Sequence, residues 1–80
     1  MNLREIVERY RKLAGAFGAA VPLSAFGLSP EETARTFSDL DDDYHISRFL
    51  SFSKSQGTEY RVGGEDVTHV TISEGVLSLL

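Results

Sequence analysis

The 80-residue chain contains no cysteine and no long apolar run. Without cysteine there are no disulfide bonds, no thiolate ligands for a zinc ion and no cysteine nucleophile. No stretch approaches the roughly 20 consecutive apolar residues that a transmembrane helix needs. Internal repeats, linkers and low-complexity segments are also missing. We therefore expect a single domain over residues 1–80, in a protein that is cytoplasmic and not bound to a membrane.

The small size of the chain limits the functions that it can support. By area scaling, a folded chain of this mass exposes roughly 4,800 Å² of surface, against about 12,800 Å² when it is unfolded. That difference leaves one modest core with little room for an enclosed active-site cavity. Hydrophobic residues make up 41% of the sequence and charged residues 25%, which are ordinary values for a globular domain.

The N-terminal part of the chain has a clear helical pattern. Apolar residues recur at intervals of three and four: Leu3, Ile6, Val7, Tyr10, Leu13, Ala14 and Phe17. This spacing predicts an amphipathic helix, which Gly15, Gly18 and Pro22 should end between Leu13 and Ala20. We interpret the stripe as core-packing, and dimerisation through the same stripe is the alternative.

The apolar stretch Leu13–Gly27 resembles the hydrophobic part of a secretory signal peptide. The leader before it contains Glu5 and Glu8 and is periodic, whereas the leader of a signal peptide is short and simply basic. The stretch also contains Pro22 and few leucines. We therefore favour a place for it within the folded domain.

Two more helices are predicted downstream. Ser29 can cap the second helix, Pro30 suits its first position and Glu32 completes a capping box, so this helix should run for about ten residues. A third helix should begin near Asp42 or Asp43 and cover residues 43–56. Its apolar arc consists of Ile46, Phe49, Leu50 and Phe52. Its opposite face has no acidic residue and consists of Ser47, Arg48, Ser51, Lys54 and Ser55.

The hydrophobic period then changes to that of strands. Residues 58–72 are rich in β-branched and aromatic side chains around Gly63-Gly64, which predicts a β-hairpin. A two-residue turn would pair Tyr60 with Val67, and a four-residue turn would pair Tyr60 with His69. Either register places Tyr60, Val62, Val67, His69 and Thr71 on one face, and the sequence does not decide which face is buried. Residues 73–80 should form a short helix or strand that packs back.

This order of elements resembles the winged-helix form of the helix-turn-helix superfamily. The likeness is sharpest over Leu28–Leu50, where Ala34 takes the small position between two helices and Ile46–Leu50 is similar to the start of a recognition helix. The stretch from Ala34 to Ile46 is about two residues too long, and Ser38 stands near the usual turn glycine. The resemblance implies an α+β, winged-helix-like fold with three helices, a β-hairpin wing and a short C-terminal element.

Such a fold makes DNA one candidate partner. The third helix would present its polar face to the major groove, with Arg61 of the wing near a phosphate. The candidate contacts are Ser47, Arg48, Ser51, Lys54, Ser55 and Arg61. However, Asp41, Asp42 and Asp43 precede that helix, and affinity for DNA depends on neutralising phosphates. We therefore expect a non-enzymatic module that binds a protein partner or self-associates, with sequence-specific DNA binding as the alternative.

Metal binding and catalysis have weaker support in the sequence. Asp39, Asp41 and Asp43 alternate like the first ligands of a calcium-binding loop, but Tyr44 and Leu50 stand where that loop needs Gly and Glu. The serines lack a nucleophile-elbow setting and the chain has no glycine-rich phosphate loop. We expect no cofactor, no metal and no catalytic residues, and we interpret the aspartates as a helix cap.

Overall fold

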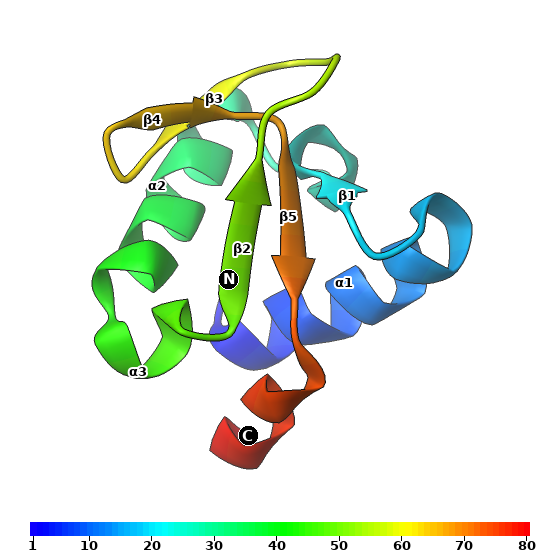
Figure 1. Ribbon diagram of the computed structural model, residues 1–80, viewed down its shortest axis with the longest axis vertical. Helices are drawn as coiled ribbons and strands as arrows, with labels where there is room; N and C mark the ends of the chain where they lie inside the picture. The colour runs from blue at the N-terminus through cyan, green and yellow to red at the C-terminus, as the bar shows by residue number, and fades with distance from the viewer.

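A computed structural model describes all 80 residues as a small, compact α+β domain (Figure 1). It has three α-helices and two 3₁₀ helices: α1 (Leu3–Phe17), η1 (Leu23–Phe26), α2 (Pro30–Asp42), α3 (Tyr44–Ser47) and η2 (Glu74–Leu79). The strands are β1 (Val21–Pro22), β2 (Leu50–Ser53), β3 (Tyr60–Val62), β4 (Glu65–Val67) and β5 (His69–Ile72). No helix is long and apolar enough to cross a membrane.

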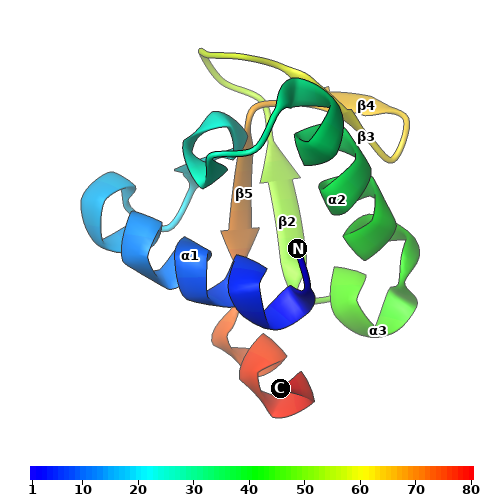
Figure 2. The ribbon, with the colours of Figure 1, turned by 180° about the vertical axis from the view of Figure 1, so that it is seen from behind.

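The strands form two small antiparallel sheets. One has three strands in the order β1-β5-β2, and the other is the β3–β4 hairpin. Helix α1 lies behind β2 and β5 in Figure 1 and in front of them in the reverse view of Figure 2. The other face of the three-stranded sheet has no helix in front of it. The fold therefore has a helical layer on one side of the sheet only.

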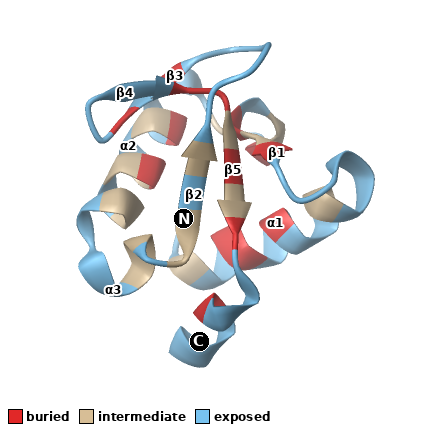
Figure 3. Cartoon of the chain, viewed as in Figure 1, coloured by how far each residue is buried: buried red, intermediate tan, exposed pale blue.

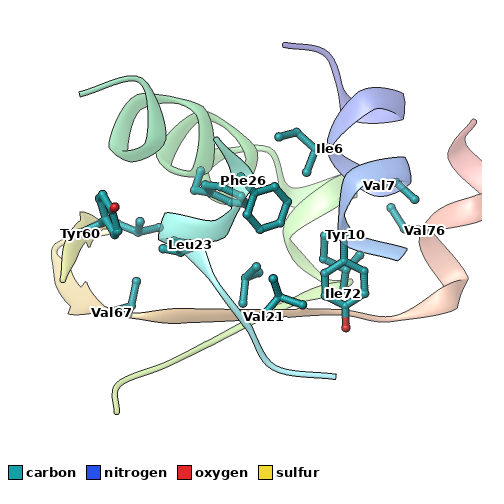
Figure 4. Packing of buried hydrophobic residues seen from close by; sticks show 13 residues of the cluster. Ile6, Val7, Tyr10, Val21, Leu23, Phe26, Tyr60, Val67, Ile72 and Val76 are labelled. Atoms are coloured by element: carbon teal, nitrogen blue, oxygen red, sulfur yellow. The ribbon is translucent and has the colours of Figure 1, made fainter. Parts of the chain in front are cut away.

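Thirteen buried apolar residues form one core between these layers: Ile6, Val7, Tyr10, Val21, Leu23, Phe26, Phe37, Tyr60, Val62, Val67, Val70, Ile72 and Val76. They come from α1, η1, α2, η2 and every strand except β2, as the red segments of Figure 3 and the side chains of Figure 4 show. The folded chain exposes 4829 Å², close to the area expected for its mass. The core is therefore of ordinary size for so short a chain.

Helix α1 confirms the first predicted helix and its core-packing stripe. Asn2 caps it by accepting a hydrogen bond from the Glu5 amide at 2.9 Å, and it ends at Phe17, before Gly18. Ile6, Val7 and Tyr10 are buried in the domain's own core.

The segment after α1 forms two elements that the sequence did not predict, β1 and η1. Val21, Leu23 and Phe26 are buried, so this apolar stretch packs within the domain, as favoured above. The Arg9 side chain donates a 2.6 Å hydrogen bond to the Phe26 carbonyl. A guanidinium at this position satisfies a carbonyl that the end of a helix leaves free. Two strand residues and one 3₁₀ turn are too short to create a periodic pattern in sequence.

Helix α2 begins as predicted. The Ser29 hydroxyl accepts a hydrogen bond from the Glu32 amide at 3.2 Å, and Pro30 is the first helical residue. The helix has 13 residues, more than the ten expected. Its Phe37 ring meets Phe26 edge-on, with 5.1 Å between centroids, and Phe52 with 6.2 Å. These aromatic contacts connect α2 to both η1 and β2.

The third predicted helix, residues 43–56, is wrong for most of its length. Only Tyr44–Ser47 is helical, and Leu50–Ser53 is strand β2. The residues of β2 alternate between apolar and polar side chains, which fits a half-buried strand. Pairing of β2 with β5 places Leu50 and Phe52 opposite Ile72 and Val70. This sheet pairing outweighs the helical spacing of the same apolar residues, because strand preference depends on the neighbouring strands.

The predicted hairpin is correct at its tip and wrong beyond it. Tyr60 pairs with Val67 across the Gly63-Gly64 turn, so the two-residue register is confirmed. The pairing stops at Val67, and β5 pairs with β1 and β2 instead. His69 and Thr71 do not share a face with buried Val67, because the buried side chains of β5 are those of Val70 and Ile72.

The cause of this change of face is a bulge at Thr68. Its amide donates to the Ser53 carbonyl at 2.9 Å, although the register of the sheet pairs Ser53 with His69. Thr68 and His69 thus both lie opposite Ser53, which is the pattern of a β-bulge. The bulge shifts by one position the alternation of side chains between the two faces of the strand. The Thr68 carbonyl accepts a hydrogen bond from the Leu23 amide at 2.9 Å. Thr68 therefore joins β5 to both neighbouring segments.

The C-terminal segment forms η2 and packs back through one residue. Val76 is 1% exposed, whereas Leu77, Leu79 and Leu80 are 39–40% exposed. The expectation that residues 73–80 pack back is therefore met by Val76, whereas the three leucines of the segment stay partly exposed. The helix extends from the lower end of the domain (Figure 1), which leaves little protein surface beside the leucines.

We expect Thr68→Val to lower the free energy of unfolding by about 1 kcal/mol, the usual worth of one side-chain hydrogen bond. The Thr68 hydroxyl accepts a hydrogen bond from the Ser55 amide at 2.9 Å and lies 2.6 Å from Nδ1 of His69. Thr71→Val makes the same change in the adjoining strand β5, where no side-chain hydrogen bond is lost, and should stay within about 0.5 kcal/mol of wild type. Urea unfolding followed by circular dichroism measures both, and equal effects would contradict the role of Thr68.

A second prediction concerns the hairpin turn, where Gly63 and Gly64 have positive φ of 59° and 80°. Alanine at either position should cost about 1–2 kcal/mol because its Cβ disfavours this conformation. Gly63→Ala should cost more, since its Cβ would collide with the Asp41 carboxylate, whereas the space at Gly64 is open. Asp41→Ala should remove the difference in a double-mutant cycle. Unchanged stability in both glycine variants would contradict the left-handed conformation of the turn.

Candidate functional site

The six candidate contact residues do not share one face of the molecule. Ser47 and Arg48 lie at the end of α3, and Ser51 lies on β2. Lys54 and Ser55 follow that strand, while Arg61 lies on the separate β3–β4 hairpin. In Figure 1, α3 is at the lower left and the hairpin is at the top. The common polar face was expected from a helix over residues 43–56, and that helix is absent.

Two of the three candidate cations have carboxylate partners. Lys54 Nζ lies 3.6 Å from Glu59 Oε2, and Arg61 Nη1 lies 3.3 Å from Asp66 Oδ1. Both pairs are exposed, so they neutralise the local charge but add little to stability. The Arg48 guanidinium has no ion-pair partner and lies 4.7 Å from the centre of the Phe49 ring. Arg48 is therefore the candidate cation with unneutralised charge.

The acidic run, Asp39 to Asp43, has local structural roles. Asp43 is the N-cap of α3, and its carboxylate accepts a hydrogen bond from the His45 amide at 3.0 Å. Asp41 lies against Gly63 of the hairpin turn. The contact of Asp43 agrees with the interpretation as a helix cap, whereas Asp39, Asp41 and Asp42 lie inside α2 and cap no helix. No group of three or more His, Asp or Glu side chains is close enough to hold a metal ion.

The structure instead brings together a polar, uncharged surface on the three-stranded sheet. Its register pairs Ser51 with Thr71 and Ser53 with His69. Because directly paired residues point to the same side of a sheet, these four side chains share the face opposite the helices. The serines are exposed, and His69 and Thr71 are half-buried. We call this surface the open sheet face.

Next to the open sheet face, β2 has an unpaired edge. In an antiparallel pair, alternate residues bond to the partner strand and the others point away from it. Phe49 and Ser53 accept hydrogen bonds from Ser73 and Thr68, so Ser51 between them also faces β5. The amides and carbonyls of Leu50 and Phe52 therefore point away from the sheet. We call this line of main-chain groups the β2 edge.

The three other strand margins of the domain are protected. β3 lies against α2, and its Arg61 carbonyl accepts a hydrogen bond from the Ser38 hydroxyl at 3.3 Å. β1 has two residues, one of which is Pro22, and β4 carries the acidic side chains of Glu65 and Asp66. Short length, proline and charge are the usual means by which proteins block pairing at an exposed strand. β2 contains no charged residue, no proline and no glycine. It is the margin on which these protections are missing.

The surface of the domain also has two hollows. One, of about 70 Å³, lies between α1 and η2 and is lined mainly by apolar residues, including Val7, Tyr10 and Ile72. The other, of about 350 Å³, is polar and lies between Met1 and α2. The first is much smaller than the roughly 300–1,000 Å³ of a usual ligand pocket, and the second is lined by only two hydrophobic residues. Neither has the features of a small-molecule site.

Comparisons with known proteins assign no family to the chain. No protein-family model, no curated protein and no solved structure matches it. The candidate site is therefore the open sheet face with the β2 edge. The sequence did not predict this site, because the spacing of Leu50 and Phe52 with Ile46 and Phe49 indicates a helix. The one sequence feature that indicates it is the alternation of apolar and polar residues over Leu50–Ser53.

Hydrogen exchange can test whether the β2 edge is open. We expect the amides of Leu50 and Phe52 to exchange with deuterated solvent at least about tenfold faster than the amide of Ser51, because that of Ser51 is bonded to β5. Two-dimensional NMR of the ¹⁵N-labelled protein resolves the three rates. Ser51 is a matched control because it lies between the other two on the same strand. Equal protection of all three amides would mean that another part of the chain covers the edge.

Proposed function

We propose that the domain acts by binding another protein, on a scaffold that is a variant of the winged-helix arrangement. The observation that carries this proposal is the three-stranded sheet, which the helices cover on one face only. A sheet face and strand edge left open to solvent provide main-chain and side-chain hydrogen-bonding groups in a rigid frame. The proposal involves no catalytic step and no cofactor.

The order of the elements supports the winged-helix part of the proposal. The three α-helices, with the short β1 and η1 between the first two, precede β2, a hairpin with a Gly-Gly turn, and β5. Helix α2 has the capped start that the resemblance places at Leu28–Glu32. The chain differs from the winged-helix arrangement in the acidic run before Ile46, where its sequence is also about two residues longer than the usual pattern. There α2 extends to Asp42, and a one-turn α3 takes the place of a long third helix.

The length of α3 favours a protein partner over DNA. A four-residue helix is about 6 Å long, whereas the major groove is about 12 Å wide and is normally occupied by several turns of helix. Lys54 and Arg61 are paired with acids, and the chain carries a net charge of −4. Few cations are therefore free to neutralise phosphates, which is the main source of affinity for DNA.

Two measurements on the wild-type chain test this proposal. At low salt we expect no mobility shift of mixed-sequence duplex DNA at protein concentrations up to about 10 µM. Selection from a phage-displayed library of random peptides on the immobilised domain should enrich a related set of peptides. Binding of duplex DNA below about 1 µM, or a failure to enrich any peptide, would contradict the proposal.

The acidic run supplies a matched control for the DNA measurement. Replacement of Asp41, Asp42 and Asp43 by Asn removes three negative charges and keeps similar side-chain shapes. If these charges alone prevented DNA binding, the variant would gain affinity by at least about tenfold. We expect no such gain, because α3 remains one turn long.

A further inference from the structure

We propose that the β2 edge binds an extended peptide as an additional antiparallel strand. This inference rests on the proposed protein-binding function and specifies its site and the form of the partner. The main-chain groups of Leu50 and Phe52 point out of the sheet, as the bonding pattern of β2 requires. Another strand is the partner that satisfies donors and acceptors spaced two residues apart along one line.

The side chains of β2 also indicate incomplete coverage at this edge. Leu50 and Phe52 are half-buried, whereas Val70 and Ile72, paired with them on β5, are 0% and 6% exposed. Leu40 of α2 is half-buried as well and packs against the same core. A strand added at β2 would place alternate side chains on the helical side of the sheet, next to these residues. The bound peptide should therefore be apolar at alternate positions.

The edge is held in place before any partner arrives. The Phe52 ring meets Phe37 of α2 edge-on, and β2 is bonded to the central strand β5 along its length. Phe49, just before the strand, packs against Gly75, where an added Cβ would come within 2.7 Å of the ring. Because the edge is already ordered, only the peptide loses conformational entropy when it binds.

The charge at the start of β2 defines the peptide further. Arg48 is the C-cap of α3 and precedes the strand, while Lys54 follows the strand. A carboxylate at the end of the peptide beside Arg48 would meet the unneutralised charge there, whereas Lys54 is already paired with Glu59. Asp42 ends α2 and Asp43 caps the far end of α3, so acidic residues of the peptide beyond Arg48 would meet like charge.

A second copy of the chain is the alternative occupant of this edge. Protection of the Leu50 and Phe52 amides that rises with protein concentration in the absence of peptide would show pairing between copies and would overturn the proposal.

A proline substitution tests the edge directly. In Leu50→Pro the ring removes an amide that points outward and bonds to no other residue, at the first position of a strand, where proline is tolerated. Leu50→Ala is the matched control, since it shortens the side chain and keeps the amide. Against a synthetic peptide enriched by phage selection, we expect Leu50→Pro to bind at least about fivefold more weakly than Leu50→Ala. Equal affinities would overturn the proposal.

A measurement on the wild-type protein serves if Leu50→Pro does not fold. Saturation with the same peptide should slow amide exchange of Leu50 and Phe52 by at least about tenfold and leave Ser51 unchanged. Arg48→Glu should weaken binding by about two- to fivefold, while Arg4→Glu on α1 should have no effect. A peptide that binds without protecting Leu50 and Phe52 overturns the edge site but leaves the protein-binding function standing. If no peptide is enriched, both the edge site and the protein-binding function are contradicted.

Discussion

At Thr68 the chain passes from the β3–β4 hairpin into the central strand β5, and one residue connects three segments. Its amide bonds to Ser53 and its carbonyl to Leu23, while its hydroxyl accepts from the Ser55 amide. Thr68 is 2% exposed, so each unmade bond would leave a polar group away from water. The bulge at this position turns the chain out of the hairpin and determines which side chains of β5 face the core. The positions of both sheets depend on it.

The one-sided cover of the sheet follows from that arrangement. Because β5 lies between β1 and β2, its main chain is satisfied on both sides, whereas each flanking strand has one margin without a strand. Pro22 and the brevity of β1 block one margin, and β2 has no comparable protection. An uncharged strand margin is usually a hazard for aggregation. A domain that keeps one can use it for binding, which is why the proposed function and the proposed site are linked.

The candidate site could be predicted from the sequence only in part. The sequence indicated the polar residues between positions 47 and 55 as contact residues. It placed them on one face of a helix, and that helix is absent from the structure. The segment from Ile46 to Phe52 fits both a helix of period 3.6 and, over Leu50–Ser53, a strand of period two. Local sequence cannot choose between these patterns, since the choice depends on whether β5 is available as a partner. β5 is in turn placed by the bulge at Thr68, for which the sequence gives no signal.

The sequence by itself determined the features that depend on near neighbours. These include the start of α2 at Ser29, the stripe of Ile6 and Val7, and the Gly63-Gly64 turn, because caps, stripes and tight turns are decided within a few residues. Only the tertiary structure decided the partner of β5, the reduction of α3 to one turn and the existence of β1. Those features arise from hydrogen bonds between residues that are distant in the chain. They also create the open sheet face and the β2 edge.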